Sequence, residues 1–165
     1  MSHDQSLALA VRGLVIAAER YRAHAARHQL GVSATEIVAL GHLYTEGPLT
    51  AAELATRLQI TSASATELID RLEKTTYAQR QPHPTDRRKR LVTLTDHGHQ
   101  AIHTVYNNLG DELAEIYTTF TPDQQRTVDH FLSATTVRLT APRPAGETCG
   151  RPTRGAVKER ATKRH

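Results

Sequence analysis

Residues 87–90 are four consecutive cations, and their types and spacing suit the binding of a negatively charged partner. They lie between two short β-branched or polar runs, residues 77–81 and 91–95, and Pro82 and Pro84 interrupt strand pairing and favour a turn. A β-hairpin with a basic tip can reach the phosphates of a nucleic-acid backbone or enter a minor groove. The segment therefore predicts contact with nucleic acid, and a solvated surface loop is the alternative.

The segment before these cations predicts two short helices joined by a tight turn. Thr50 and Glu53 form a capping-box pattern that begins the first helix, and Thr61 can cap a second helix that runs to about Lys74. This is the helix-turn-helix pattern, and the alternative is a plain helical hairpin in a bundle. Short hydroxyl side chains and free backbone N–H groups at the start of the second helix can bond phosphates or base edges. The residues expected to contact DNA there are Thr61, Ser62, Ala63, Ser64, Thr66, Glu67 and Arg71.

Amphipathic helices are expected on both sides of this unit. Gly31 is a natural stop for the first of them, and Ser33 with Glu36 forms a capping box that begins the next. Pro122 suits the first turn of the last helix. Because a β-hairpin follows the helix-turn-helix directly, the sequence predicts a mainly α fold with a small β-hairpin wing, a winged helix-turn-helix. The expected flanking helices are residues 7–30, 33–44, about 96–120 and 121–139.

Composition limits the classes of protein to which the chain can belong. Its 165 residues fit one domain with a real core, and no apolar run approaches the roughly 18 residues of a transmembrane helix. The N-terminus lacks the pattern of a secretory signal, and the single cysteine, Cys149, fits a reducing cytosol. We find no glycine-rich phosphate loop, nucleophile elbow or paired-carboxylate framework. We therefore expect a cytoplasmic protein that is not an enzyme, needs no cofactor and has no membrane partner.

The net charge of +4 is unevenly distributed along the chain. Residues 140–165 carry seven Lys or Arg against two Glu, so this segment holds +5 and residues 1–139 hold −1. Its prolines, glycines and cations lack apolar periodicity, which predicts a disordered basic tail. The cations at residues 87–90, together with Arg80, are therefore a better indication of a nucleic-acid partner than the basic pI.

At this point the sequence resembles the MarR family of bacterial transcriptional regulators. The resemblance rests on Asp-Arg-Arg at residues 86–88 and Leu-Thr-Asp-His-Gly at residues 94–98, which fit the family's wing signature of Asp-x-Arg followed by Leu-Thr-x-x-Gly. The helix patterns at residues 52–55 and 68–74 also match. The resemblance extends over residues 7–139 and implies a DNA-binding lobe at about 47–95, with dimerisation helices at about 5–30 and 96–139.

The resemblance also implies a function. A homodimer would place one winged helix on each half of a palindromic operator, and it would act as a repressor that a small aromatic ligand releases. Arg88 looks like the wing-tip arginine that enters the minor groove, and Asp86 like the carboxylate that holds it. Arg87, Lys89 and Arg90 would then be phosphate contacts. The alternatives are a non-sequence-specific architectural DNA-binding protein, a helical interaction module, and a zinc-responsive regulator of the same fold.

Two residues depart from what this function favours. Thr76 stands where the family commonly has glycine after the recognition helix, so the helix end is expected to be displaced, strained or extended. Glu67 could accept a hydrogen bond from a cytosine amino group, but it would also repel phosphate. The operator sequence therefore does not follow from these residues.

Aromatic residues and histidines supply the candidates for small-molecule or metal binding. Tyr21, His42, Tyr44 and Tyr106 are expected to line an effector crevice, although the same residues could belong to the core. Histidines four residues apart on one helix can bind zinc, but the chain has no HExxH or CxxC motif to complete a site, so no metal is expected. The weak metal candidates are His24, His28, His42, His99 and His103.

Overall fold

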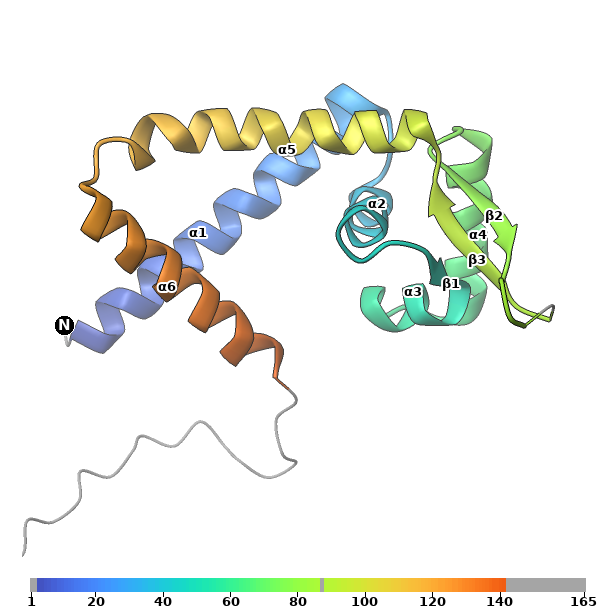
Figure 1. The fold of residues 1–165 in the computed structure, drawn as a ribbon, viewed down its shortest axis with the longest axis horizontal. Helices are drawn as coiled ribbons and strands as arrows, with labels where there is room; N and C mark the ends of the chain where they lie inside the picture. The colour runs from blue at the N-terminus through green and yellow to red at the C-terminus, as the bar shows by residue number, and fades with distance from the viewer. Residues whose placement is uncertain (1–2, 87, 142–165) are drawn as a thin grey trace, which may run out of the picture. The chain divides into compact units, whose positions relative to one another are not determined.

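The computed structural model describes residues 3–86 and 88–141 (Figure 1). The described residues fall into two compact units, divided between Ile116 and Tyr117, and each unit is described separately. The helices are α1 (His3–Ala25), which continues as a π-helical turn (Ala26–Leu30), α2 (Ala34–Glu46), α3 (Ala51–Leu58), α4 (Ser62–Lys74), α5 (Asp96–Tyr117) and α6 (Pro122–Thr140). The strands are β1 (Leu49–Thr50), β2 (Ala78–Pro82) and β3 (Arg90–Leu94). In the part of the chain so described, no helix is both long and apolar enough to span a membrane.

Helices α2, α3 and α4 begin at the hydroxyl residues that the sequence predicted as caps. Ser33 and Thr50 form complete capping boxes with Glu36 and Glu53, and the Thr61 side chain accepts the backbone N–H of Ser64. Each cap satisfies N–H groups that the first helical turn leaves without a partner. The expected bounds hold to within a few residues. Helix α2 runs two residues beyond the expected Tyr44, and the end of the first helix is π-helical.

The three strands form an antiparallel sheet in the order β1-β3-β2. The predicted hairpin is present, but the sequence did not reveal β1, which pairs Leu49 with Val92. The expectation that Pro82 interrupts pairing was wrong, because Pro82 is the last residue of β2 and lies opposite Arg90. Proline is tolerated there because β2 is an edge strand, where a missing N–H need not break a ladder.

The core of the first unit joins the helix-turn-helix to the helices around it. Its largest fully buried side chains come from α2, α3, α4, β3 and α5, and α4 also contacts β2. They are Leu40, Leu54, Leu68, Ile69, Leu72, Val92 and Ile102. Burial of this apolar face fixes which side of α4 points to solvent.

The contacts at the start of α5 explain why the wing signature Leu-Thr-x-x-Gly requires these residue types. Leu94 is buried, and Thr95 donates its hydroxyl to the carbonyl oxygen of Thr76 at 2.6 Å while accepting the N–H of Gly98 at 3.0 Å. The N–H of Thr95 also donates to the carbonyl oxygen of Tyr77 at 3.1 Å. A Cβ at Gly98 would lie 2.0 Å from that same carbonyl oxygen. The signature therefore joins the start of α5 to the chain that follows α4.

Helix α4 ends in a Schellman motif whose left-handed residue is Thr76. The N–H of Tyr77 donates to the carbonyl oxygen of Leu72, and that of Thr76 to the carbonyl oxygen of Glu73, both at 3.0 Å. Thr76 has φ +61°, a conformation that its β-branched side chain disfavours. The sequence predicted that the end of this helix would be displaced, strained or extended. Of these three outcomes the structure shows strain, in the left-handed backbone of Thr76.

We expect Thr76→Gly to stabilise the protein by about 1 kcal/mol, because glycine adopts this φ without steric cost. Urea unfolding at fixed protein concentration measures the change. Thr75→Gly is the matched control: Thr75 has an ordinary φ of −85°, so glycine there should destabilise. A Thr76→Gly variant no more stable than the wild type would contradict the strain.

Candidate nucleic-acid interface

Helix α4 presents the predicted contact residues on its exposed face. Ser62, Ala63, Ser64, Thr66 and Glu67 are all exposed. The hydroxyls are partly engaged, because Thr66 donates to the carbonyl oxygen of Ser62 and the Thr61 and Ser64 hydroxyls lie 2.9 Å apart. The face is therefore small, polar and held in place, as docking into a major groove requires.

The wing carries its cations at a solvent-exposed tip. The side chain of Arg88 is 97% exposed, and Lys89 and Arg90 are also exposed. Arg87 lies outside the described residues. The expected basic tip is thus present at residues 88–90, where the side chains can reach a partner without moving the sheet.

Asp86, the expected wing support, contacts both Arg88 and Lys89 in this tip. Its Oδ1 accepts the backbone N–H of Arg88 at 3.1 Å and lies 3.9 Å from the Arg88 Nε. Its Oδ2 lies 4.0 Å from the Lys89 Nζ, and its carbonyl oxygen accepts the Lys89 N–H at 2.9 Å. The hydrogen bond from the Arg88 backbone N–H to the carboxylate fixes the backbone position from which the Arg88 side chain extends. This bond contributes more to the placement of Arg88 than the exposed 3.9 Å ion pair does.

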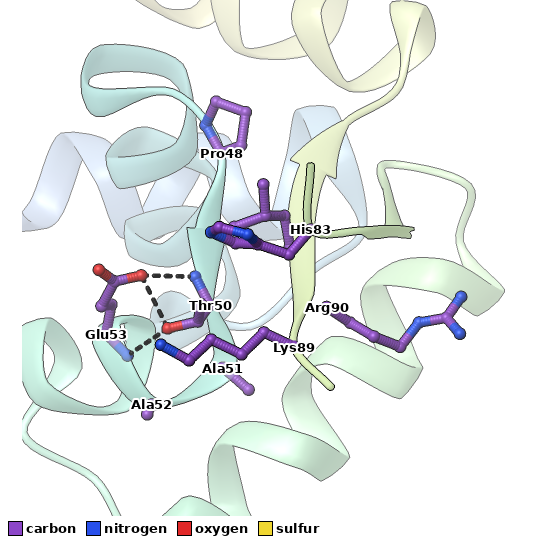
Figure 2. A pocket seen from close by; sticks show the side chains of 9 residues that line it. Pro48, Thr50, Ala51, Ala52, Glu53, His83, Lys89 and Arg90 are labelled. Carbon is purple, nitrogen blue, oxygen red and sulfur yellow. Dashed lines mark hydrogen bonds between the residues drawn. The ribbon is translucent and has the colours of Figure 1, made fainter. Parts of the chain in front are cut away.

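A hollow of about 660 Å³ lies between the wing and the start of α3 (Figure 2). Figure 2 shows the Glu53 carboxylate turned to the N–H and hydroxyl of Thr50, with Lys89 extended over the same helix end. The Thr50 hydrogen bonds, followed by the charges of Arg57 and Lys89, lower the pKa of Glu53. The start of α3 is therefore already occupied by a carboxylate of the chain itself.

Arg71, a predicted DNA contact, is engaged in an ion pair with α2. Its Nε donates to Oε1 of Glu36 at 2.5 Å, and Glu36 is only 6% exposed. Burial raises the pKa of Glu36, but hydrogen bonds from Ser33 and Arg71 outweigh it and leave that pKa below its ordinary value. The Arg71 side chain is 54% exposed, so it could still reach a phosphate, and that contact stays a prediction. Its ion pair with Glu36 joins α4 to α2.

Arg80 does not belong to the free basic cluster in which the sequence placed it. From β2 it pairs with Asp70 at 2.7 Å and with Glu73, both on α4, and its backbone N–H also donates to Glu73. These carboxylates offset its charge, so the arginine holds β2 to α4. Charges this far apart in sequence gave no pattern by which the pairing could be recognised.

Three of the four residues expected to form one effector crevice are neighbours: Tyr106 shares a hollow with Tyr21, and its ring centroid lies 5.5 Å from that of Tyr44. Tyr21 and Tyr106 line a hollow of about 310 Å³ between α1 and α5. Tyr44 lines another of about 240 Å³ with His99 and His103. His42 lines neither of these hollows and pairs with Glu46 at 2.8 Å.

The histidine pairs are used in contacts within the protein. The rings of His24 and His28 lie 4.5 Å apart, and His103 places Nδ1 2.9 Å from the Tyr44 hydroxyl and Nε2 3.0 Å from the Asn107 side chain. Over residues 3–86 and 88–141, no three His, Cys, Asp or Glu side chains come together as a metal site.

Comparison with known proteins places this geometry in a known group. The sequence pattern of the MarR family matches residues 32–89. The chain is 32% identical over 95 residues to the transcriptional regulator YkoM of Bacillus subtilis, which covers 58% of the chain and 62% of YkoM. It is 30% identical over 97 residues to the regulator ML2140 of Mycobacterium leprae, which covers 59% of the chain and 68% of that protein. The crystal structure of RV1404 from Mycobacterium tuberculosis matches with a TM-score of 0.68 and 25% identity, over 87% of this chain and 98% of that one.

Proposed function

The chain belongs to the MarR family of helix-turn-helix transcriptional regulators, and from that membership we propose that it binds double-stranded operator DNA through α4 and the wing. The observation that carries this proposal is the wing tip, where Asp86 holds the backbone of a fully exposed Arg88. Helix α4 would dock its polar face in the major groove, while Arg88 enters the adjacent minor groove. Lys89 and Arg90 would contact phosphates.

We propose that the functional unit is a homodimer. Helix α6 buries no residue of its own, and it exposes Phe131, Leu132 and Val137. Leu7 and Leu14 of α1 are likewise exposed. Several large apolar side chains exposed on the same helices are typical of a surface that a partner subunit covers. A dimer with two-fold symmetry also suits a palindromic operator.

We further propose that the dimer acts as a repressor from which a small aromatic ligand releases DNA. The hollow beside Tyr21 and Tyr106 would bind the ligand, because aromatic side chains and a mostly apolar lining favour such a molecule. Ligand binding would favour a spacing of the two wings that does not match successive grooves of the DNA. The fraction of dimer bound to the operator would therefore fall.

Selection of duplexes from genomic fragments, followed by Arg88→Ala, tests the DNA-binding proposal. We expect the variant to bind the selected duplex about 10- to 100-fold more weakly and to lose part of its preference over a scrambled duplex. Lys89→Ala is the matched control, since loss of a phosphate contact weakens both duplexes alike and reduces the salt dependence. Unchanged affinity of Arg88→Ala at moderate salt would contradict the wing assignment. Steep salt dependence without a preferred duplex would instead indicate an architectural DNA-binding protein.

A further inference from the structure

We propose that His83 is a positioning residue for the wing, whose neutral imidazole closes the wing turn and whose protonation opens it. This role of His83 rests on the proposed DNA-binding function for its consequence, but its geometry belongs to the wing alone.

The Nδ1 atom of His83 acts as the acceptor for the turn. It lies 3.3 Å from the backbone nitrogen of Thr85 and 3.2 Å from that of Asp86, and the Thr85 hydroxyl is 3.3 Å away. A backbone N–H can only donate, so Nδ1 must carry a lone pair toward both of them. The geometry therefore assigns Nδ1 as the acceptor and the ring proton to Nε2.

This bond network continues from His83 to the cationic tip. Asp86, whose N–H is held by His83, holds in turn the N–H of Arg88 through Oδ1 and the N–H of Lys89 through its carbonyl oxygen. The backbone N–H of His83 donates to the carbonyl oxygen of Lys89 at 3.1 Å, which closes the segment on itself. The placement of Arg88 thus depends on an imidazole five residues before it.

The charges around His83 are mixed. The ring lines the hollow of Figure 2, where Glu53 of α3 and the cations Lys89 and Arg90 lie, and Asp86 follows it in the turn. Two carboxylates favour a proton on the ring and two cations disfavour it. Hydrogen-bond geometry therefore decides the preferred state, because only the neutral ring can accept both backbone N–H groups.

A proton on Nδ1 would place an N–H against two other N–H groups. The turn would lose its acceptor, and Asp86 would no longer be fixed beneath Arg88. The added positive charge would at the same time increase general attraction to phosphate. Protonation of the His83 ring by acid should therefore weaken the preference for an operator over other DNA.

The full-length protein without DNA provides the first test. We would follow the NMR signals of the Thr85 and Asp86 amides from about pH 8 to 5 in the wild type, His83→Asn and His83→Ala. The asparagine oxygen can accept the same N–H groups but does not titrate, so His83→Asn should keep both signals constant. The wild-type signals should move as the His83 ring is protonated, and His83→Ala should show an open turn throughout. Wild-type signals that change no more than those of His83→Asn would overturn the proposal.

The second test measures binding to the selected duplex and to its scrambled counterpart over the same pH range. We expect the wild-type preference to fall about tenfold on acidification, comparable to the loss of one specific contact, while His83→Asn keeps its preference. Equal pH dependence of the two proteins would overturn the role of His83 in DNA binding. If the amides titrate as expected but no duplex is preferred at any pH, the titrating turn stands and the proposed DNA-binding function is wrong.

Discussion

Replacement of Gly98 by alanine is expected to destabilise the protein by about 3 kcal/mol or more. The added methyl group would lie 2.0 Å from the carbonyl oxygen of Tyr77 and 2.9 Å from its carbonyl carbon, and neither backbone atom can move aside as a flexible side chain would. That carbonyl also accepts the N–H of Thr95. Relief of the clash would therefore pull the start of α5 away from the chain that follows α4.

Gly110→Ala on the same helix is the matched control. A Cβ there meets no atom within 4 Å, so alanine should stabilise the helix by about 0.5–1 kcal/mol. Urea unfolding at one protein concentration compares the two variants. If Gly98→Ala unfolds at the same urea concentration as the wild type, the close approach of α5 to Tyr77 is wrong.

The second large effect is expected from Arg71→Ala, which should destabilise the protein by about 2–4 kcal/mol near neutral pH. The variant would leave the Glu36 carboxylate buried against α4 without its cation. Glu36 would keep the Ser33 hydrogen bonds of its capping box, so the loss would report the contact between α2 and α4.

The effect of Arg71→Ala should depend on pH. The pKa of Glu36 is lowered in the folded protein from 4.5, because the Ser33 and Arg71 hydrogen bonds outweigh burial. A lowered carboxyl pKa contributes stability that is complete above the unfolded value and is lost as pH falls through the folded value. The difference in unfolding free energy between wild type and variant should therefore shrink as pH falls below about 4.5.

Arg126→Ala is the control for this ion pair. Arg126 pairs with Asp123 at the start of α6, but both side chains are largely exposed, so its removal should cost less than about 0.5 kcal/mol. Equal losses for Arg71→Ala and Arg126→Ala, or a loss that persists unchanged in acid, would contradict a structural role for the buried carboxylate.

Local patterns predicted the elements well, because their signals lie within a few residues of each other. The hydroxyls of Ser33, Thr50 and Thr61 each face a backbone N–H three residues on, so the starts of α2, α3 and α4 followed from the sequence. The wing was predicted for the same reason. Strand β1 was missed because two residues carry no alternation, and it forms only by pairing with β3.

The roles of the charged residues could not be predicted in the same way. Arg71 and Arg80 read as cations for DNA, yet their partners Glu36 and Asp70 lie on elements that only the fold brings close. His83 was not predicted as a turn residue, although its hydrogen bonds are local. Its side chain accepts the N–H groups of Thr85 and Asp86, a role that is usual for asparagine or aspartate and not for histidine. Ion pairing between elements depends on tertiary packing, which periodicity does not encode.

The proline in β2 also bears on how the protein behaves at high concentration. Strands β1 and β2 form the two edges of the sheet, and edge strands in general invite pairing with another chain and the growth of aggregates. Strand β1 is only two residues long, and β2 carries Pro82 at its end and the ion-paired Arg80 at its centre. These features limit association of the protein through its sheet edges.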